Sequence, residues 1–281
     1  MTCFFVSDLH GRINCYQTLF SKILDERPKA VFLGGDLLPS FGGGRYESFV
    51  RDYLSVKFGD IREELGNEYP RVFLILGNDD GRKEEVDVIS IMEKEHLWEY
   101  IHNKKIEYQT YTIYGYAHVP PTPFLNKDWE RYDISRYVDP GCVPPEEGWH
   151  TVEQPLNIIQ HATIKQDLNK LVEDNDLSRS IFLFHTPPYQ TNLDRAALDG
   201  KMIDHVPLDV HVGSIAVKNM IVEREPLMTM HGHIHESARL TGSWKEQLGK
   251  TAILSAAHDG PELAVVKFDL DNPREATREL C

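Results

Sequence analysis

The sequence predicts an α/β protein, in which buried strands alternate with helices. Two observations predict this class: short apolar runs recur, each followed by polar residues, and stretches with helical spacing lie between them. Runs of four or five aliphatic or aromatic residues bounded by glycine or aspartate are typical of buried strands. The runs are Cys3–Val6, Ala30–Leu33, Val72–Leu76, Ile181–Phe184, Leu227–Met230 and Ile253–Leu254.

Four helices are expected between these strands, because apolar residues recur there at the spacing of one helical face. The four stretches are Tyr16–Leu24, about 45–65, Leu168–Val172 and Ser214–Ile221. Pro28 closes the first stretch, and Ser214 has the side chain of an N-cap for the fourth.

The C-terminal segment 251–268 is expected to form a β-hairpin. Its first strand leads to Asp259-Gly260-Pro261, which has the composition of a turn. In the second strand, Ala264, Val266 and Phe268 alternate onto one face. The pattern therefore indicates two neighbouring antiparallel strands.

The segment 119–155 breaks the alternation of strands and helices. It combines seven prolines with Trp129, Tyr132, Tyr137 and Trp149. So many prolines exclude regular structure, whereas so many aromatic residues are unlike a flexible linker. We expect an ordered excursion that packs on the body of the protein, either walling a pocket or covering exposed core. Because no repeat and no linker is evident, residues 1–281 are predicted to form one domain.

The charge balance limits the partners. The 281 residues include 30 Lys and Arg against 44 Asp and Glu, a formal net charge of −14. An acidic chain is poorly suited to nucleic acid or to an anionic membrane, because both require a basic surface. A small phosphate ester is not excluded, since a local cation can override the net charge.

Cysteine usage and the N-terminus predict a cytoplasmic protein. The four cysteines include no C-x-x-C pair, which excludes a cysteine zinc site and fits a reducing compartment. No apolar run approaches the roughly 20 residues that span a bilayer. The first residues lead at once into Ser7-Asp8, without the basic start and apolar length of a signal peptide.

Side chains that can bind metal follow five of the predicted strands. In layered α/β proteins, ligands gather at the carboxyl ends of strands, where loops converge. Asp-x-His and His-x-His spacing places both side chains on one side of an extended segment. The five motifs are Asp8-Leu9-His10, Gly34-Gly35-Asp36, Gly77-Asn78-Asp79-Asp80, His185 and Gly232-His233-Ile234-His235.

These motifs offer seven oxygen and nitrogen ligands, namely Asp8, His10, Asp36, Asn78, His185, His233 and His235. Seven ligands exceed the needs of one ion and suit two divalent ions bridged by a carboxylate such as Asp36. Imidazole and carboxylate donors without a thiolate suit Mn, Fe, Zn, Co or Ni. Each motif alone is common in ordinary turns, so the prediction depends on all five occurring in order.

The sequence resembles the calcineurin-like metallophosphoesterases, whose motifs D-x-H, G-D, G-N-[HD], H and G-H-x-H stand here in that order from Asp8 to His235. Within this family it resembles the bacterial and archaeal Icc-like phosphoesterases in the stretches His185-Thr186-Pro187-Pro188, His211-Val212-Gly213-Ser214 and Gly232-His233-Ile234-His235-Glu236-Ser237. The resemblance implies a four-layer αββα sandwich of two mixed sheets flanked by helices. It also implies a bridging hydroxide that attacks phosphorus in line.

The resemblance further implies how the ligands divide between the two ions. The first ion would be held by Asp8, His10, Asp36 and His235. The second would be held by Asp36, Asn78, His185 and His233.

Two further residues are catalytic candidates beside Asp36 and Asn78. Asp79 stands where many family members have a histidine that donates a proton or contacts phosphate. A carboxylate is a poor acid at neutral pH unless its pKa is raised, so Asp79 either favours esters that need little leaving-group protonation or orients a ligand. His211 lies just before the expected helix start at Ser214, where it could contact phosphate or be an ordinary loop histidine.

The predicted function is a dinuclear metal-dependent phosphoesterase, more specifically a phosphodiesterase acting on a small molecule. The alternatives are a nuclease or a phosphomonoesterase of the same fold, and a catalytically silent metal-binding scaffold. The net charge of −14 and the lack of a basic, aromatic stripe argue against the nuclease. All seven ligands are retained, which argues against the scaffold.

Overall fold

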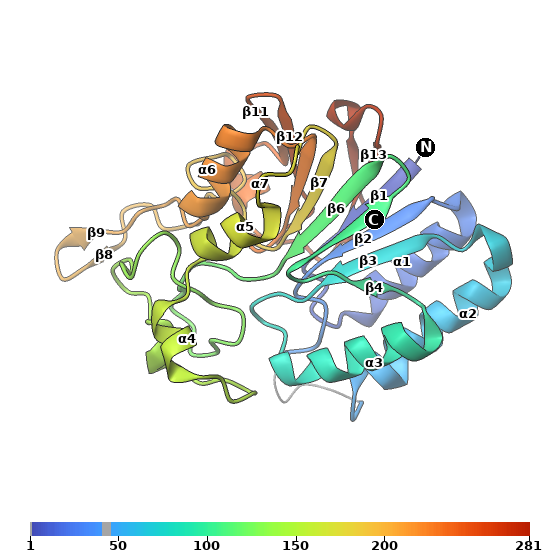
Figure 1. Cartoon of the computed structure of the whole chain (residues 1–281), viewed down its shortest axis with the longest axis horizontal. Coiled ribbons are helices and arrows are strands. Elements are labelled where there is room, and N and C mark those ends of the chain that lie inside the picture. Colours follow the sequence, from blue (N-terminus) through green and yellow to red (C-terminus); the bar gives the residue numbers. More distant parts are fainter. Residues whose placement is uncertain (1, 41–45) are drawn as a thin grey trace.

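Two six-stranded mixed sheets pack against each other in the computed structural model, which describes residues 2–40 and 46–281 (Figure 1). In the first sheet β1 to β4 are parallel, and β13 and β14 extend the sheet in antiparallel fashion. Its order is β14 (Thr277–Leu280), β13 (Ala264–Asp269), β1 (Thr2–Val6), β2 (Ala30–Gly34), β3 (Arg71–Ile75) and β4 (Glu99–Tyr100).

The second sheet has four parallel strands, β12, β10, β7 and β6, with an antiparallel strand at each edge. Its order is β11 (Lys245–Leu248), β12 (Thr251–Ser255), β10 (Met228–His231), β7 (Ser180–Phe184), β6 (Tyr111–Tyr116) and β5 (Lys104–Tyr108). A separate two-stranded ribbon consists of β8 (Met202–Ile203) and β9 (Val206–Pro207).

Helices cover the outer face of each sheet, which makes four layers in the order helix, sheet, sheet, helix (Figure 1). The first sheet is covered by α1 (Ile13–Glu26), α2 (Val56–Leu65) and α3 (Glu85–Glu95), and the second by α5 (Ile164–Val172) and α6 (Ile215–Arg224). The short helices are α4 (Leu156–His161) and α7 (Ser237–Thr241). The αββα sandwich implied by the family resemblance is therefore confirmed.

The predicted helices form where apolar periodicity and capping coincide. In α1 the residues that face the sheet are apolar and buried, and Arg27 ends the helix with a left-handed backbone. Ser214 begins α6 as predicted, because its Oγ accepts a hydrogen bond from the amide of Val217 at 3.0 Å. The second stretch begins only at Val50, as a π-helical segment (Val50–Ser55) that continues into α2; Arg45 lies outside the described residues.

The predicted C-terminal hairpin is wrong, because its two strands belong to different sheets. β12 pairs with β10 and β11 in the second sheet, whereas β13 pairs with β1 and β14 in the first. Residues 256–263 cross from one sheet to the other. A strand, turn and strand in sequence can form either a hairpin or such a crossing, and local patterning does not distinguish the two.

The segment 119–155 has no strand or α-helix in the part of the chain that the structure describes. It contains one 3₁₀ turn, Pro145–Glu147, and isolated bridges such as Val119 with Glu130. Trp129 and Tyr132 are buried, and the segment packs on the body of the protein. The elements predicted from the sequence do not include α3 or the strands β4, β5 and β6. In β6, Gly115 and four tyrosine or threonine residues interrupt any apolar run.

Candidate metal centre

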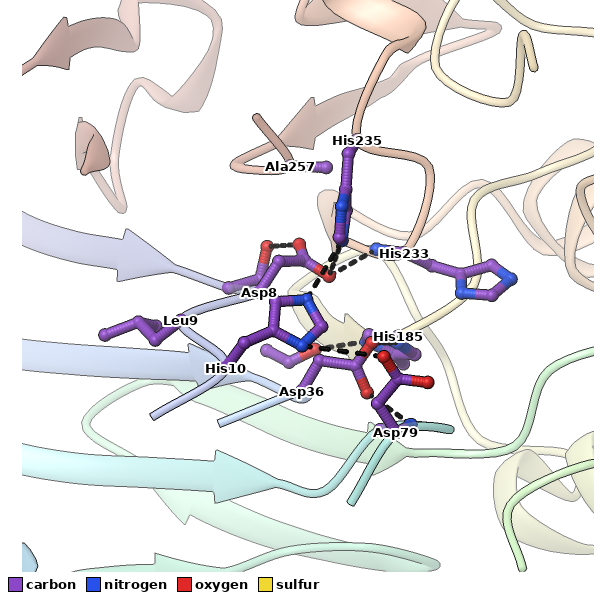
Figure 2. Close-up of polar contacts among 12 residues, drawn as sticks. Asp8, Leu9, His10, Asp36, Asp79, His185, His233, His235 and Ala257 are labelled. Carbon is purple, nitrogen blue, oxygen red and sulfur yellow. Dashed lines mark hydrogen bonds and ion pairs between the residues drawn. The ribbon is translucent and has the colours of Figure 1, made fainter. Parts of the chain in front are cut away.

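The five motifs lie at the carboxyl ends of β1, β2 and β3 in one sheet and of β7 and β10 in the other. Because these strands end at a common edge, their loops bring residues from distant parts of the chain together (Figure 2). Two overlapping groups of potential ligands result, and Asp36 belongs to both.

The first group comprises Asp8, His10, Asp36 and His235, and one ligand atom of each lies within 4.8 Å of all the others. His235 Nε2 is 3.3 Å from Asp8 Oδ1 and 3.2 Å from His10 Nε2. Ser7 Oγ also hydrogen-bonds to Asp8 Oδ2. Asp8 and Asp36 are buried, whereas about a third of the His235 side chain is exposed.

The second group comprises Asp36, His185 and His233, again within 4.8 Å of one another. His185 Nε2 lies 3.2 Å from Asp36 Oδ2 and 3.0 Å from Asn78 Oδ1, which brings the amide of Asn78 to the same point. The other ring nitrogen of His185, Nδ1, lies 2.8 Å from the carbonyl of Gly34. The structure therefore brings together all seven side chains that the sequence motifs suggested.

The backbone reaches this geometry differently from the extended segments expected from the sequence. Asp8, His10, Asp36 and His233 all have positive φ angles, of 58°, 45°, 52° and 72°. Residues other than glycine adopt this left-handed conformation at a cost of roughly 1–3 kcal/mol each, and such strain is concentrated at functional sites. The prediction that Asp-x-His and His-x-His run extended is therefore wrong, although each pair does face the site.

Two glycines allow the ligand loops to approach closely. A Cβ atom at Gly77 would lie 2.3 Å from Asp36 Oδ1 and 2.5 Å from the Asp36 amide nitrogen. Gly35 has φ +93°, and a Cβ there would lie 2.7 Å from His185 Nδ1. Any larger residue would displace a potential ligand.

The carboxylates are paired with histidines. Burial alone would raise the pKa of Asp8 and of Asp36, but His235 beside Asp8 and His185 beside Asp36 outweigh burial and lower both pKa values. Burial alone would lower the pKa values of His185 and His235. The charge of Asp36 instead raises the pKa of His185 to about 10, and the hydrogen bond to Asp8 raises the pKa of His235 to about 9. Burial and the charge of His185 lower the pKa of His233 to about 3.

The residues present fit a pair of divalent cations. Among the described residues, Asp8 and Asp36 form ion pairs with histidines only and with no lysine or arginine. Buried carboxylates need a positive partner, and divalent ions supply it without the long side chain of a basic residue. The donors are imidazole nitrogens, carboxylate oxygens and one amide oxygen, a set that suits divalent transition-metal ions and not the softer Cu(I).

Asp79 and Asp80 differ in their surroundings. The Asp79 side chain is 43% exposed, the Asp79 amide donates to Asp36 Oδ1 at 2.8 Å, and its carboxylate lies 3.6 Å from His10 Nδ1. Burial and the charge of Asp36 raise its pKa. Asp80 is fully buried and accepts hydrogen bonds from the amides of Gly77, Leu37 and Leu38 at 2.8–3.1 Å. The sequence motifs did not indicate this role of Asp80, for which its place directly after the Asn78-Asp79 pair was the available signal.

His211 contacts none of the seven side chains in the pairs that the structure records. Its Nδ1 lies 2.8 Å from Oδ1 of the buried Asp194, and its ring packs edge-on against Tyr189. Asp194 also accepts hydrogen bonds from the amides of Gln190, Thr191 and Gly213. The phosphate-contacting role of His211 therefore stays a prediction.

The excursion at 119–155 binds the loop that carries Asn78. The Asn126 side chain donates from Nδ2 to the Asn78 carbonyl at 3.0 Å. Asp128 accepts from the Arg82 amide at 2.7 Å, and Thr151 Oγ1 accepts from the Lys83 amide at 3.0 Å. No sequence motif signalled these contacts, because they join residues more than 40 positions apart.

Comparison with known proteins places this geometry in a family. The family model for calcineurin-like phosphoesterases matches residues 1–237. The chain belongs to this family. It is accordingly a metal-dependent phosphoester hydrolase, and the matched region contains all seven potential ligands.

The fold of this calcineurin-like phosphoesterase also resembles solved structures at low sequence identity. The protein TT1561 of Thermus thermophilus has a TM-score of 0.58 at 16% identity, over 99% of this chain and 98% of that one. A dimetal phosphatase from Danio rerio has a TM-score of 0.50 at 12% identity, over 95% of this chain and 91% of that one. No curated protein sequence matches the chain. In the described part of the chain, every helix is too short or too polar to cross a membrane.

Proposed function

We propose that this phosphoesterase hydrolyses a small phosphodiester at a centre of two divalent transition-metal ions, of Mn, Fe, Zn, Co or Ni. The observation that carries the proposal is the pair of overlapping donor groups that share Asp36. Asp8, His10, Asp36 and His235 would hold one ion, and Asp36, Asn78, His185 and His233 the other. Such ions lower the pKa of water and neutralise the charge that develops on phosphate during in-line attack.

The protein's own groups keep these donors in place. The Gly34 carbonyl fixes the ring of His185, and Asp80 ties the loop at Gly77 to the loop at Leu37 and Leu38. Preorganised ligands cost little reorganisation when the substrate binds, which is the main contribution of a protein to metal-assisted hydrolysis.

The residue after Asn78 supports a diester as substrate. At that position the chain has a carboxylate that lies beside His10, and not an imidazole free to protonate a leaving group. Diesters with good leaving groups depend less on such protonation than alkyl monoesters do. The net charge of −14 disfavours long polyanions such as DNA or RNA and leaves small esters as the fitting class.

Metal reconstitution tests the proposal. The metal-stripped protein is loaded separately with Mn, Fe, Zn, Co and Ni and assayed with matched chromogenic monoesters and diesters. We expect diester turnover with at least one metal, and its loss by a factor of about 100 or more in Asp36→Asn and His185→Ala, since the first removes the shared anionic carboxylate and the second an imidazole donor. Asp60→Ala, an exposed change on α2, is the matched control.

Three outcomes would contradict the proposal in different ways. If none of the five metals supports turnover of any ester, the result would favour a catalytically silent scaffold. Faster cleavage of monoesters than of diesters would indicate a phosphomonoesterase. Preferred cleavage of single-stranded DNA or RNA, added as a separate arm, would indicate a nuclease.

A further inference from the structure

We propose that Asp79 is a positioning residue that holds the His10 ring toward the first ion, in place of acting on the substrate as a proton donor. The inference rests on the proposed two-ion centre and concerns a residue that differs from the histidine many relatives have there. In Figure 2 the His10 ring lies between His235 and Asp79.

The two nitrogens of His10 face different partners. Nε2 lies 3.2 Å from His235 Nε2, so it points into the first donor group, and the two rings meet edge to face with centroids 5.0 Å apart. Nδ1 points the other way and lies 3.6 Å from Asp79 Oδ2. A histidine that ligates through one nitrogen generally has an acceptor on the other, which sets the tautomer and the ring orientation.

His185 shows the same arrangement in the second donor group. Its Nε2 faces Asp36 and Asn78, and its Nδ1 is held by the Gly34 carbonyl at 2.8 Å. Asp79 lies on the outer side of the His10 ring as the Gly34 carbonyl does for His185, but at an ion-pair distance of 3.6 Å instead of a hydrogen-bond distance. Among the described residues, Asp79 is the only carboxylate in ion-pair contact with Nδ1 of His10.

Asp79 is itself fixed by ligands of the second group. Its amide donates to Asp36 Oδ1 at 2.8 Å, and its Oδ1 accepts from Asn78 Nδ2 at 3.2 Å. One short residue thus touches His10, Asp36 and Asn78. These contacts orient the carboxylate toward His10 and couple the geometry of the two ion positions.

His10 also stands on strained backbone. Its φ angle is 45°, in the left-handed region, and its side chain is 18% exposed. Strained backbone persists where surrounding contacts hold it, and the Asp79 carboxylate is one such contact of His10.

Metal binding tests the proposal without relying on activity. Co²⁺ is titrated into the metal-stripped parent, Asp79→Ala, Asp79→Asn and the control Asp60→Ala, and binding is followed by calorimetry and by the visible absorption of Co²⁺. We expect one of the two binding steps to weaken about 10–100-fold in Asp79→Ala, with a smaller loss in Asp79→Asn, because an outer partner typically contributes that much to affinity. The other step, and both steps in Asp60→Ala, should change less than threefold.

Excess metal then separates positioning from proton donation. With saturating metal, Asp79→Ala should regain a large part of the kcat that it loses at limiting metal, because its ligands are intact and the lost alignment mainly lowers their affinity. Unchanged affinities together with a kcat loss that metal does not restore, and with a lost limb in the pH–rate profile, would overturn the proposal. Should Asp79→Ala fail to fold, Asp79→Asn provides the same comparison.

Co²⁺ binding by the parent protein shows whether the two-ion centre or only the role of Asp79 is wrong. If the parent binds no Co²⁺, the proposed two-ion centre is wrong and this inference fails with it. If the parent binds two ions and Asp79→Ala binds them equally well, the centre stands and only the role of Asp79 is wrong.

Discussion

Gly77 shows how tightly single residues constrain the centre. The chain passes so close to Asp36 at this point that only a hydrogen atom fits where other residues carry a Cβ. Asp80, three residues on, bonds the Gly77 amide and the amides of Leu37 and Leu38 with one carboxylate. The loop after β3 is therefore joined to the loop after β2 both by contact and by hydrogen bonds.

We predict that Gly77→Ala abolishes the shared ligand position and leaves the fold intact. The new methyl group would meet Asp36 at 2.3 Å, so the carboxylate or the loop must move. We expect metal affinity to fall at least about 10-fold, measured by calorimetry, with unchanged far-UV circular dichroism. Gly59→Ala is the matched control, since a Cβ there meets nothing within 4 Å and the residue lies in α2. Equal metal affinity in Gly77→Ala and the parent would contradict the prediction.

Among the secondary-structure elements, the excursion 119–155 is attached to α6, because it caps the start of that helix. Asp133, within it, accepts hydrogen bonds from Ser214 Oγ and from the amides of Ile215 and Ala216, at 2.5–3.2 Å. These amides are the first of α6, and helix N-termini favour negative charge. The excursion thus stabilises α6 while its residue Asn126 bonds the loop of Asn78.

Replacing Asp133 should therefore destabilise both segments together. In Asp133→Ala, three donors at the start of α6 lose their acceptor, and we expect a loss of about 2–3 kcal/mol in the free energy of unfolding. Urea denaturation measures this loss, and limited proteolysis should cut faster within 119–155. A change below about 0.5 kcal/mol, as expected for exposed positions such as Asp60→Ala, would show that the cap contributes little.

At the scale of the whole molecule, buried histidines determine how stability depends on acid. His102 and His118 are fully buried, and burial, followed by the charges of Arg82 and Arg131, holds their pKa values well below 6.5. In the unfolded chain they titrate near the ordinary value of about 6.5. Below that pH the unfolded chain binds protons that the folded chain does not, so acid favours unfolding.

We predict that the free energy of unfolding falls as the pH drops below about 6.5, by up to about 1.4 kcal/mol per pH unit for each such histidine. His185 and His235 act in the opposite sense. Their raised pKa values of about 10 and 9 stabilise the metal-free protein fully below pH 6.5, and this contribution is lost as pH rises toward 9–10. Urea midpoints of the metal-free protein at pH 5, 6 and 7 measure the acid limb, and His118→Phe should flatten it. An equal slope in parent and variant would refute the assignment.

Metal removal should also be visible in global stability. An ion that binds only the folded chain adds about 2.7 kcal/mol at a free concentration of 100 times its Kd. We therefore expect a chelator to lower the Tm of the metal-loaded protein by several degrees, read by calorimetry. Asp36→Asn, which lacks the shared carboxylate, should show a much smaller difference. A Tm that is the same with and without chelator in the parent would contradict this prediction.

Much of the site could be predicted because its information is local in the sequence. Each motif holds its ligand within a few residues of a strand end, as with Asp36 after β2 and His185 after β7. Their convergence at one edge follows from the general placement of ligands in layered α/β proteins. The αββα order came from the family resemblance, since runs of apolar residues do not reveal which strands pair.

The sequence by itself determined which side chains reach the centre, because strand ends and ligand types are properties of short segments. Only the tertiary structure decided that β12 and β13 lie in different sheets, and that Asp8 and His10 reach the site through left-handed backbone. It alone places Asp79 beside His10 and Asn126 on the Asn78 carbonyl. These features depend on contacts between residues far apart in the chain, and their energies exist only once the two sheets have packed together.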